Sequence, residues 1–191
     1  MAITINGNGT IGGVSVGGLP DGIVDTDMLA SNAVTSALLP AGSVLQVVDS
    51  GAQSTPSTSQ STTFIDGNCT ASITPSSASS KIIVCVTQEL QVWNNSNYAT
   101  GRWKIQRNIG GGAFSDIYID SSTANGNIFA YDYGGSGINI YRPTNYTLVD
   151  SPSSTSVVVY KTQIAQGSNG GNRISANQNS PGRMILMEIA G

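Results

Sequence analysis

The chain has no histidine, and charged residues make up only 10 % of its 191 residues. The lack of histidine excludes Ser-His-Asp and Cys-His catalytic systems and removes the commonest metal ligand. The charged fraction is far below the roughly 25 % of ordinary globular proteins. The 8 lysine and arginine residues are scattered and the net charge is −3, so no basic surface for nucleic acid is expected. We therefore expect no enzyme activity, no metal or cofactor and no nucleic-acid partner.

Cysteine and long apolar runs are equally scarce. The two cysteines, Cys69 and Cys85, are too few for a disulfide scaffold and wrongly spaced for a zinc site, so we expect buried free thiols. The longest apolar runs, 82–86 and 184–187, are much shorter than the ~20 residues that span a bilayer. The first residues lack a charged segment followed by an apolar one. We expect neither a secretory signal nor membrane insertion.

The abundant residues are small polar ones and β-branched ones. Isoleucine, valine and threonine occur 19, 14 and 17 times, whereas leucine occurs 8 times, and this excess favours strands. The polar segment 50–62 is expected to be an exposed loop. A single C-terminal β-sandwich or jelly-roll domain is predicted, and the fold class is mainly β. The expected strands are 43–49, 68–74, 81–92, 99–108, 113–120, 127–132, 137–141, 145–149, 156–165 and 182–189. Along 81–92 one face is expected to be apolar and the other solvated, because Ile82, Val84, Val86, Leu90 and Val92 alternate with Thr87, Glu89 and Gln91.

Composition divides the chain into three regions. Residues 1–24 hold seven glycines and cannot bury a core, so we expect a strip that lies against a larger partner. Residues 25–42 form a short neck with one helix at 25–39, which aspartates favour at its start and Pro40 ends. Residues 43–191 form the β domain.

The helix and the last strand each lack a partner within the chain. The helix carries an apolar stripe, but about 14 residues are marginal in isolation and no second helix is predicted. The last strand is apolar on both faces, and a thin sandwich covers only one of them. We therefore predict a homotrimer with interface residues Met28, Val34, Leu38, Met184 and Leu186.

Aromatic and amide side chains gather between two of the predicted strands. They combine ring faces that stack on sugars with amides that bond hydroxyl groups. If strands 81–92 and 99–108 form a hairpin, this segment is its exposed tip. Core or rim packing explains the aromatic residues equally well, and Tyr131 with Tyr133 is a second candidate. The predicted ligand-binding residues are Trp93, Asn94, Asn95, Asn97 and Tyr98.

Both ends of the sequence resemble short fibre-like virion proteins of tailed bacteriophages, particularly marine and cyanobacterial phages. The similar segments are the opening 1–39 with Gly42–Val48, SITPSSASSKIIV (72–84), YTLVDSPSSTSVVVYKTQ (146–163) and MILMEIAG (184–191). The resemblance implies a homotrimeric virion appendage: a virion-binding strip at 1–24, a three-helix neck, and a β domain at the particle surface. It implies no catalytic residues. Many relatives have longer coiled-coil-like repeats before the β domain, whereas this chain has one predicted helix.

Two functions remain open. The first is a non-enzymatic tail-fibre-like protein, assembled into the virion in the host cytoplasm, whose β domain binds host surface glycan. The second is a purely structural neck, connector or capsid decoration protein. Both predict attachment to other virion proteins through residues 1–24, and binding to host cells distinguishes them. A depolymerase tailspike is disfavoured because such enzymes need a longer chain and paired carboxylates.

Overall fold

The computed structural model divides into two compact units, Met1–Leu38 and Leu39–Gly191. In the first unit, β1 (Thr4–Ile5) and β2 (Ile11–Gly12) form an antiparallel pair. Of the predicted helix at 25–39, only residues 35, 38 and 39 are described. The structure describes residues 4–5, 11–12, 35, 38–95, 98–119, 128–131, 137–167 and 173–191, with the backbone alone at 4–5, 11–12 and 128–131.

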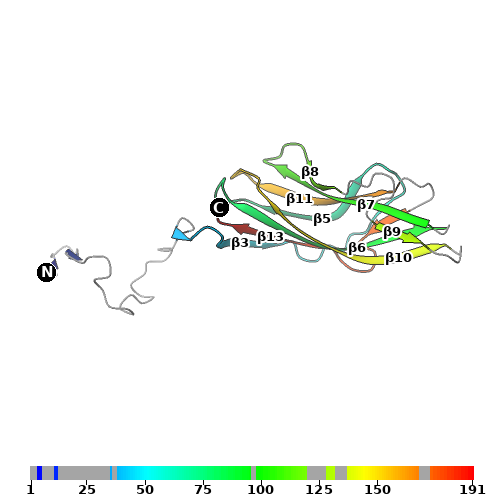
Figure 1. The fold of residues 1–191 in the computed structure, drawn as a ribbon, viewed down its shortest axis with the longest axis horizontal. Coiled ribbons are helices and arrows are strands. Elements are labelled where there is room, and N and C mark those ends of the chain that lie inside the picture. The colour runs from blue at the N-terminus through cyan, green and yellow to red at the C-terminus, as the bar shows by residue number, and fades with distance from the viewer. Residues whose placement is uncertain are drawn as a thin grey trace. The chain divides into compact units, whose positions relative to one another are not determined.

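The second unit is a sandwich of two antiparallel sheets (Figure 1). β6 is the centre of the first sheet, and β10 pairs with it along one edge from end to end. β13 and β12 share the other edge of β6, and β3 and β4 lie beyond them. The strands of this sheet are β3 (Val44–Asp49), β4 (Ser57–Ser59), β6 (Lys81–Asn94), β10 (Ile138–Asp150), β12 (Arg173–Ala176) and β13 (Arg183–Ile189).

The second sheet packs against the inner face of the first. β11 lies between β5 and β7, and β8 and β9 share the remaining edge of β7. Its strands are β5 (Ile65–Ile73), β7 (Tyr98–Ile109), β8 (Ser115–Ile119), β9 (Ile128–Tyr131) and β11 (Val158–Gln166). The prediction of a mainly β fold with a C-terminal β-sandwich is confirmed.

Alternation of side chains along β6 decides which face lies inside. As predicted, its apolar residues Ile82, Val84, Val86, Leu90 and Val92 are buried between the sheets. Thr87 is exposed and Glu89 half-buried on the other face. Side chains alternate between the two faces of a strand, so the pairing register of β6 decides which residues along its whole length face the core and which face solvent. The inner set packs with residues of the second sheet, among them Trp103, Ile105, Tyr160 and Ile164.

A buried polar network crosses this core. Gln88 is a polar residue among the inward-facing apolar residues of β6, and it is fully buried. Its Oε1 accepts a hydrogen bond from Trp103 Nε1 at 3.0 Å, and its Nε2 donates to the Gly67 carbonyl at 2.6 Å and to Asn177 Oδ1 at 3.1 Å. Asn177 Nδ2 lies 3.1 Å from the Asn68 carbonyl and 3.3 Å from that of Gly67, within donating distance of both. Satisfied in this way, the network fixes how the two sheets meet.

A buried carboxylate lies near one end of the core. Glu188 points inward from β13, and its carboxylate accepts hydrogen bonds from Gln46 Nε2 at 2.6 Å and from the Ser76 backbone and hydroxyl at 2.7 Å. Burial raises the pKa of this carboxyl, but the hydrogen bonds from Gln46 and Ser76 outweigh burial and leave the pKa below its usual value. The ionised form of Glu188 therefore ties β3 to the segment before β6.

The two ends of the sandwich are distinct. At one end, Gly42 N donates to the Ala190 carbonyl and Ala190 N to the Ser43 carbonyl, both at 2.8 Å. These bonds join the start of β3 to the C-terminus, which Figure 1 shows at the same end. We call this end proximal. The end at which β6 stops and β7 starts is called distal.

Some strands differ from the prediction. β10 is one strand where two were predicted, and Pro143 lies in its middle. An edge strand tolerates proline because its outward N–H groups have no partner strand. β4 and β12 were not predicted, and β4 lies within the segment 50–62 that was expected to be an exposed loop. β4 pairs with β12 at the edge of the first sheet, and its Ser59 is buried.

Candidate functional site

The predicted hairpin at 93–98 is wrong, because β6 and β7 belong to different sheets. β6 pairs with β10, β12 and β13, whereas β7 pairs with β8, β9 and β11. The chain therefore crosses from one sheet to the other after Asn94, and its side chains are distributed between the sheets.

The structure separates the predicted sugar-binding residues. Trp93 is half-buried on the outer face of the first sheet, whereas Tyr98 begins β7 in the second. Asn94 turns inward, and its Nδ2 donates to the Tyr98 carbonyl at 2.5 Å. Asn95 is exposed just beyond β6. The remaining candidates, Asn97, Tyr131 and Tyr133, lie outside the described side chains.

A different set of aromatic and amide side chains meets on the outer face of the first sheet. We call it the distal patch. Neighbouring strands lie about 4.8 Å apart, and successive residues on one face lie about 7 Å apart, so the two rows of the patch are adjacent. Strand register puts Asn139, Trp93 and Arg173 in the first row and Tyr141, Gln91, Ser175 and Thr58 in the second.

Hydrogen bonds fix the side chains of the distal patch in place. Gln91 Nε2 donates to Asn139 Oδ1 at 2.5 Å and to Tyr141 Oη at 3.0 Å. The hydroxyls of Thr58 and Ser175 are 2.8 Å apart. The Arg173 guanidinium lies over the Trp93 ring, 5.0 Å from its centroid. The patch thus combines two aromatic rings with oriented polar groups, of which Asn139 is exposed while Gln91 and Ser175 are buried.

The proximal half of the same outer face is apolar. One row crosses the whole sheet and consists of Val149, Ile83, Met187 and Val47. Val149 and Val47, at its two ends, are 61 % and 59 % exposed. Ile185 and Cys85 continue the surface distally. The neighbouring row carries Ile189 and the exposed Val44 beside the exposed Lys81 of β6. We call the apolar residues of this surface the proximal face.

The predicted interface residues fall in different places. Met184 and Leu186 point between the sheets and are fully buried within one chain, so they pack on the chain's own second sheet. The side of β13 that remains uncovered carries Ile185, Met187 and Ile189 instead. Leu38 is exposed. Met28 and Val34 lie outside the described residues.

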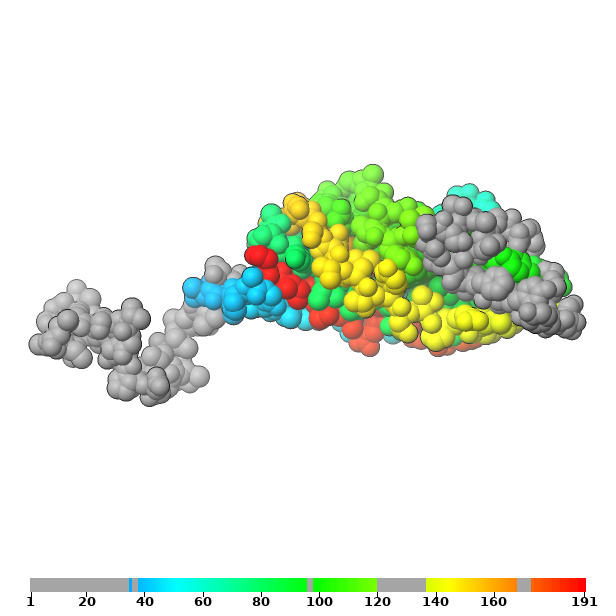
Figure 2. All heavy atoms as spheres, in the orientation of Figure 1, coloured from blue at the N-terminus to red at the C-terminus, as the bar shows by residue number. Residues whose placement is uncertain are grey.

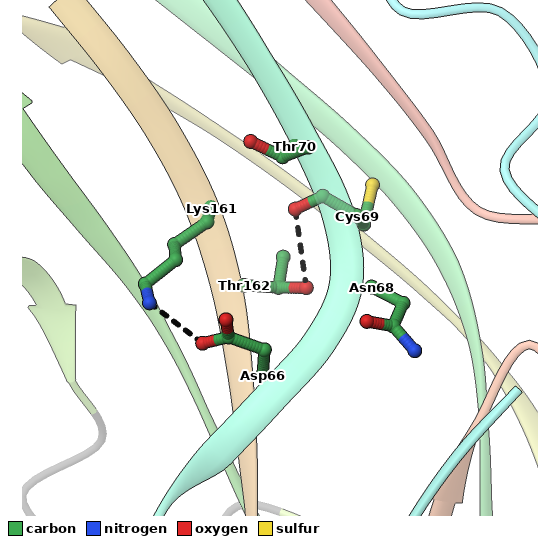
Figure 3. Close-up of a pocket in the computed structure, with 6 residues that line it drawn as sticks. All are labelled: Asp66, Asn68, Cys69, Thr70, Lys161 and Thr162. Atoms are coloured by element: carbon green, nitrogen blue, oxygen red, sulfur yellow. Dashed lines mark hydrogen bonds and ion pairs between the residues drawn. The ribbon is translucent and has the colours of Figure 1, made fainter. Parts of the chain in front are cut away.

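A polar hollow of about 320 Å³, open to solvent, lies on the second sheet at an irregularity between β5 and β11 (Figure 3). Figure 3 shows Asp66 and Lys161 turned toward one another, 2.6 Å apart. Desolvation raises the pKa of Asp66, but hydrogen bonds from Gln163 and Lys161 outweigh it and lower that pKa. Cys69 points away, and burial raises the pKa of its thiol to about 12. The only carboxylate lining the hollow is already neutralised.

The described part of the chain has two further properties. It contains no group of three or more acidic or cysteine side chains placed to hold a metal ion. No helix in it is long and apolar enough to cross a membrane. Cys69 and Cys85 are free thiols, as predicted; Cys69 is buried and Cys85 half-buried on the proximal face.

Comparison with known proteins finds structural likeness only. No family model and no curated protein sequence matches the chain. Three solved structures of infectious bursal disease virus match 76 % of it: the Gt strain (14 % identity, TM-score 0.32), the T=1 particles (13 %, 0.31) and the VP2 subviral particle (11 %, 0.32). The chain covers 38 %, 36 % and 37 % of those chains. Such scores are too low to transfer fold or function from these proteins.

Proposed function

We propose that the chain is a non-enzymatic structural subunit of a virion that assembles with copies of itself through the proximal face. The finer form of the proposal is a homotrimeric, tail-fibre-like bacteriophage appendage. In it, residues 1–24 attach to other virion proteins, and the sandwich is displayed at the particle surface. The resemblance of both sequence ends to tailed-phage virion proteins supports the virion assignment.

The observation that carries the assembly part is the uncovered apolar row on the first sheet. Two of its four side chains, Val47 and Val149, are well over half exposed. Burial of apolar surface contributes roughly 25 cal/mol per Å² to stability, so it is favourable for another protein surface to pack on a contiguous apolar row of this kind. In the single chain nothing among the described residues covers it.

The position of the proximal face favours copies of the same chain as the cover. It lies at the end where β3 enters the sandwich, and the exposed Leu39 precedes that strand. The predicted neck helix at 25–39 comes directly before it in sequence. Distally, the face is bounded by the exposed ion pair of Arg183 and Asp49, which gives the apolar core and polar rim of a protein interface.

Recognition of a host surface glycan is the second part of the proposal. The distal patch, at the far end of the same sheet, supports it by combining aromatic rings with oriented amides. The alternative, a purely structural neck, connector or capsid decoration protein, has the same assembly and no ligand.

Particles made from altered genes test the virion assignment. The copy number of the protein in purified virions is measured by quantitative mass spectrometry for wild type, for a deletion of residues 1–24 and for Val47→Asp. We expect the deletion to remove the protein from particles while leaving it folded, and Val47→Asp to reduce incorporation. Full occupancy by the deleted form would contradict the assignment, as would absence of the wild-type protein from virions.

A further inference from the structure

The distal patch has the composition of a saccharide-binding surface and carries an unusual cation. It joins two aromatic rings, two amides and two hydroxyls on one flat sheet face. Planar rings stack on the apolar faces of sugars, and amides bond their hydroxyls. Tyr141 is the more open ring, 42 % exposed on the edge strand β10.

The hydrogen bonds within the patch leave particular atoms for a ligand. Both hydrogens of Gln91 Nε2 are engaged, by Asn139 Oδ1 and by Tyr141 Oη. Among the described residues, the amide hydrogens of Asn139 and the hydroxyl hydrogen of Tyr141 have no partner, and both residues are exposed. Gln91 is itself buried, and its bonds to Asn139 and Tyr141 hold these two groups side by side in fixed orientations. A ligand therefore meets a surface whose polar groups are already ordered.

Arg173 adds a positive charge that forms no ion pair with a carboxylate among the described residues. The guanidinium lies over Trp93, and its Nε is buried without a hydrogen-bond partner. The nearest acidic residue on this face of β6, Glu89, accepts a hydrogen bond from the Asn179 backbone at 2.9 Å. Among the described residues, the ion pairs are Lys104–Asp116, Arg107–Asp150, Lys161–Asp66 and Arg183–Asp49.

We propose that the distal patch binds a carboxylate-bearing saccharide, such as one that contains a uronic or sialic acid. Arg173 receives the carboxylate in a charge-assisted, two-pronged hydrogen bond. Tyr141 stacks on the neighbouring sugar ring, and Asn139, held in place by Gln91, bonds its hydroxyls. Charge complementarity selects this class over neutral glycans. The inference names the ligand class and site for the glycan-binding part of the proposed function, and it is independent of the oligomeric state.

Direct binding to defined glycans tests the proposal. The purified full chain is applied to an array of neutral, uronic-acid and sialic-acid oligosaccharides. The best acidic oligosaccharide is then titrated by calorimetry beside its carboxyl-reduced, neutral counterpart. We expect binding to the acidic form, weaker binding at high salt, and a loss of about tenfold or more on carboxyl reduction. Equal affinity for the two forms, or no acidic oligosaccharide bound on the array, would overturn the proposal.

Matched variants locate the site. Arg173→Gln should lose about tenfold in affinity, and Tyr141→Ala should lose several-fold. Two control variants make the same kinds of change outside the distal patch. Arg142→Gln removes another cation that has no described carboxylate partner, and Phe114→Ala removes an aromatic ring that is 39 % exposed. Both should bind as wild type. Equal losses in controls and test variants would show binding by net charge or general apolarity and would refute the site.

The outcomes separate this inference from the proposed function. Loss of glycan binding with normal incorporation into particles leaves the virion role intact. Each variant is compared at an unchanged melting temperature, so that a folding defect is recognised. If the wild-type protein is present in virions yet binds no acidic glycan, the structural alternative is favoured and the inference fails.

Discussion

Replacing Gln88 by leucine tests the buried network that joins the two sheets. The side chain is 0 % exposed and makes hydrogen bonds to Trp103, Gly67 and Asn177. Leucine has a similar size but no polar atoms. The Trp103 indole N–H then loses this acceptor and Asn177 Oδ1 loses this donor, while the Gly67 carbonyl still lies 3.3 Å from Asn177 Nδ2.

The expected cost follows from the number of buried hydrogen bonds lost. Removing one partner of a buried hydrogen bond costs about 1–3 kcal/mol, so losing the bonds to Trp103 and Asn177 predicts a loss of about 2–6 kcal/mol in the free energy of unfolding. Folded domains have about 5–15 kcal/mol in total. The melting temperature should therefore fall by on the order of 10 °C.

A second glutamine of the same strand supplies the control. Gln91 also donates two hydrogen bonds, but its partners Asn139 and Tyr141 are exposed and can bond water instead. Gln91→Leu should cost about 1 kcal/mol or less. Urea unfolding followed by tryptophan fluorescence measures both variants. Equal destabilisation of the two, or a stable Gln88→Leu, would refute the reasoning.

The remaining predictions concern the pH dependence of stability, the packing between the sheets and the reactivity of the thiols. Because the pKa of Glu188 is lowered in the folded state, this residue stabilises the fold above its ordinary pKa of 4.5, and the stabilisation is lost as pH falls through the folded pKa. Glu188→Gln should therefore flatten this part of the curve of stability against pH. A variant with the wild-type curve would contradict this prediction. Gly101→Ala should destabilise by about 1–3 kcal/mol in thermal or urea unfolding, since its Cβ would lie 2.4 Å from Ile174 Cδ1, and wild-type stability would contradict the packing. A thiol reagent at pH 8 should modify Cys85 in dissociated protein but Cys69 only in denaturant, as detected by mass spectrometry. Cys69 is protected because it is buried and its pKa is raised to about 12. Labelling of Cys69 in folded protein would contradict this prediction.

The sequence predicted the strands better than their partners. Apolar alternation from Ile82 to Val92 identified both the strand and its buried face. Pairing depends on contacts between distant segments, and nothing local distinguishes a hairpin between β6 and β7 from a crossing between sheets. β12 was missed because four residues with one isoleucine give too weak a pattern. β4 was missed because Ser57, Thr58 and Ser59 read as loop.

The candidate site was predicted in part for the same reason. The sequence pointed to Trp93 as an aromatic residue beside amides, and Gln91 shares its face by period two. Asn139 and Tyr141 reach this face only through the register of β10 on β6, and Arg173 only through β12. Both faces of β13 were recognised as apolar. Which of them faces the chain's own core depends on the position of the second sheet.

β10 connects the two surfaces on which the account depends. It runs along the length of the sandwich in Figure 2 (yellow), with Tyr141 in the distal patch and Val149 in the proximal face. The outward-facing side chains of β10 thus change from polar at its distal end to apolar at its proximal end. One sheet therefore carries the proposed ligand surface and the proposed assembly surface without overlap.

Sedimentation equilibrium of the full chain tests assembly through the proximal face most directly. At micromolar concentration the wild type should sediment at three times the chain mass of 19.6 kDa. The double variant Val47→Asp with Val149→Asp should sediment as a folded monomer, because each carboxylate would be desolvated at the contact. Ile119→Asp, an exposed apolar residue of the other sheet, should remain a trimer. A monomeric wild type, or a double variant that sediments like wild type, would contradict the account.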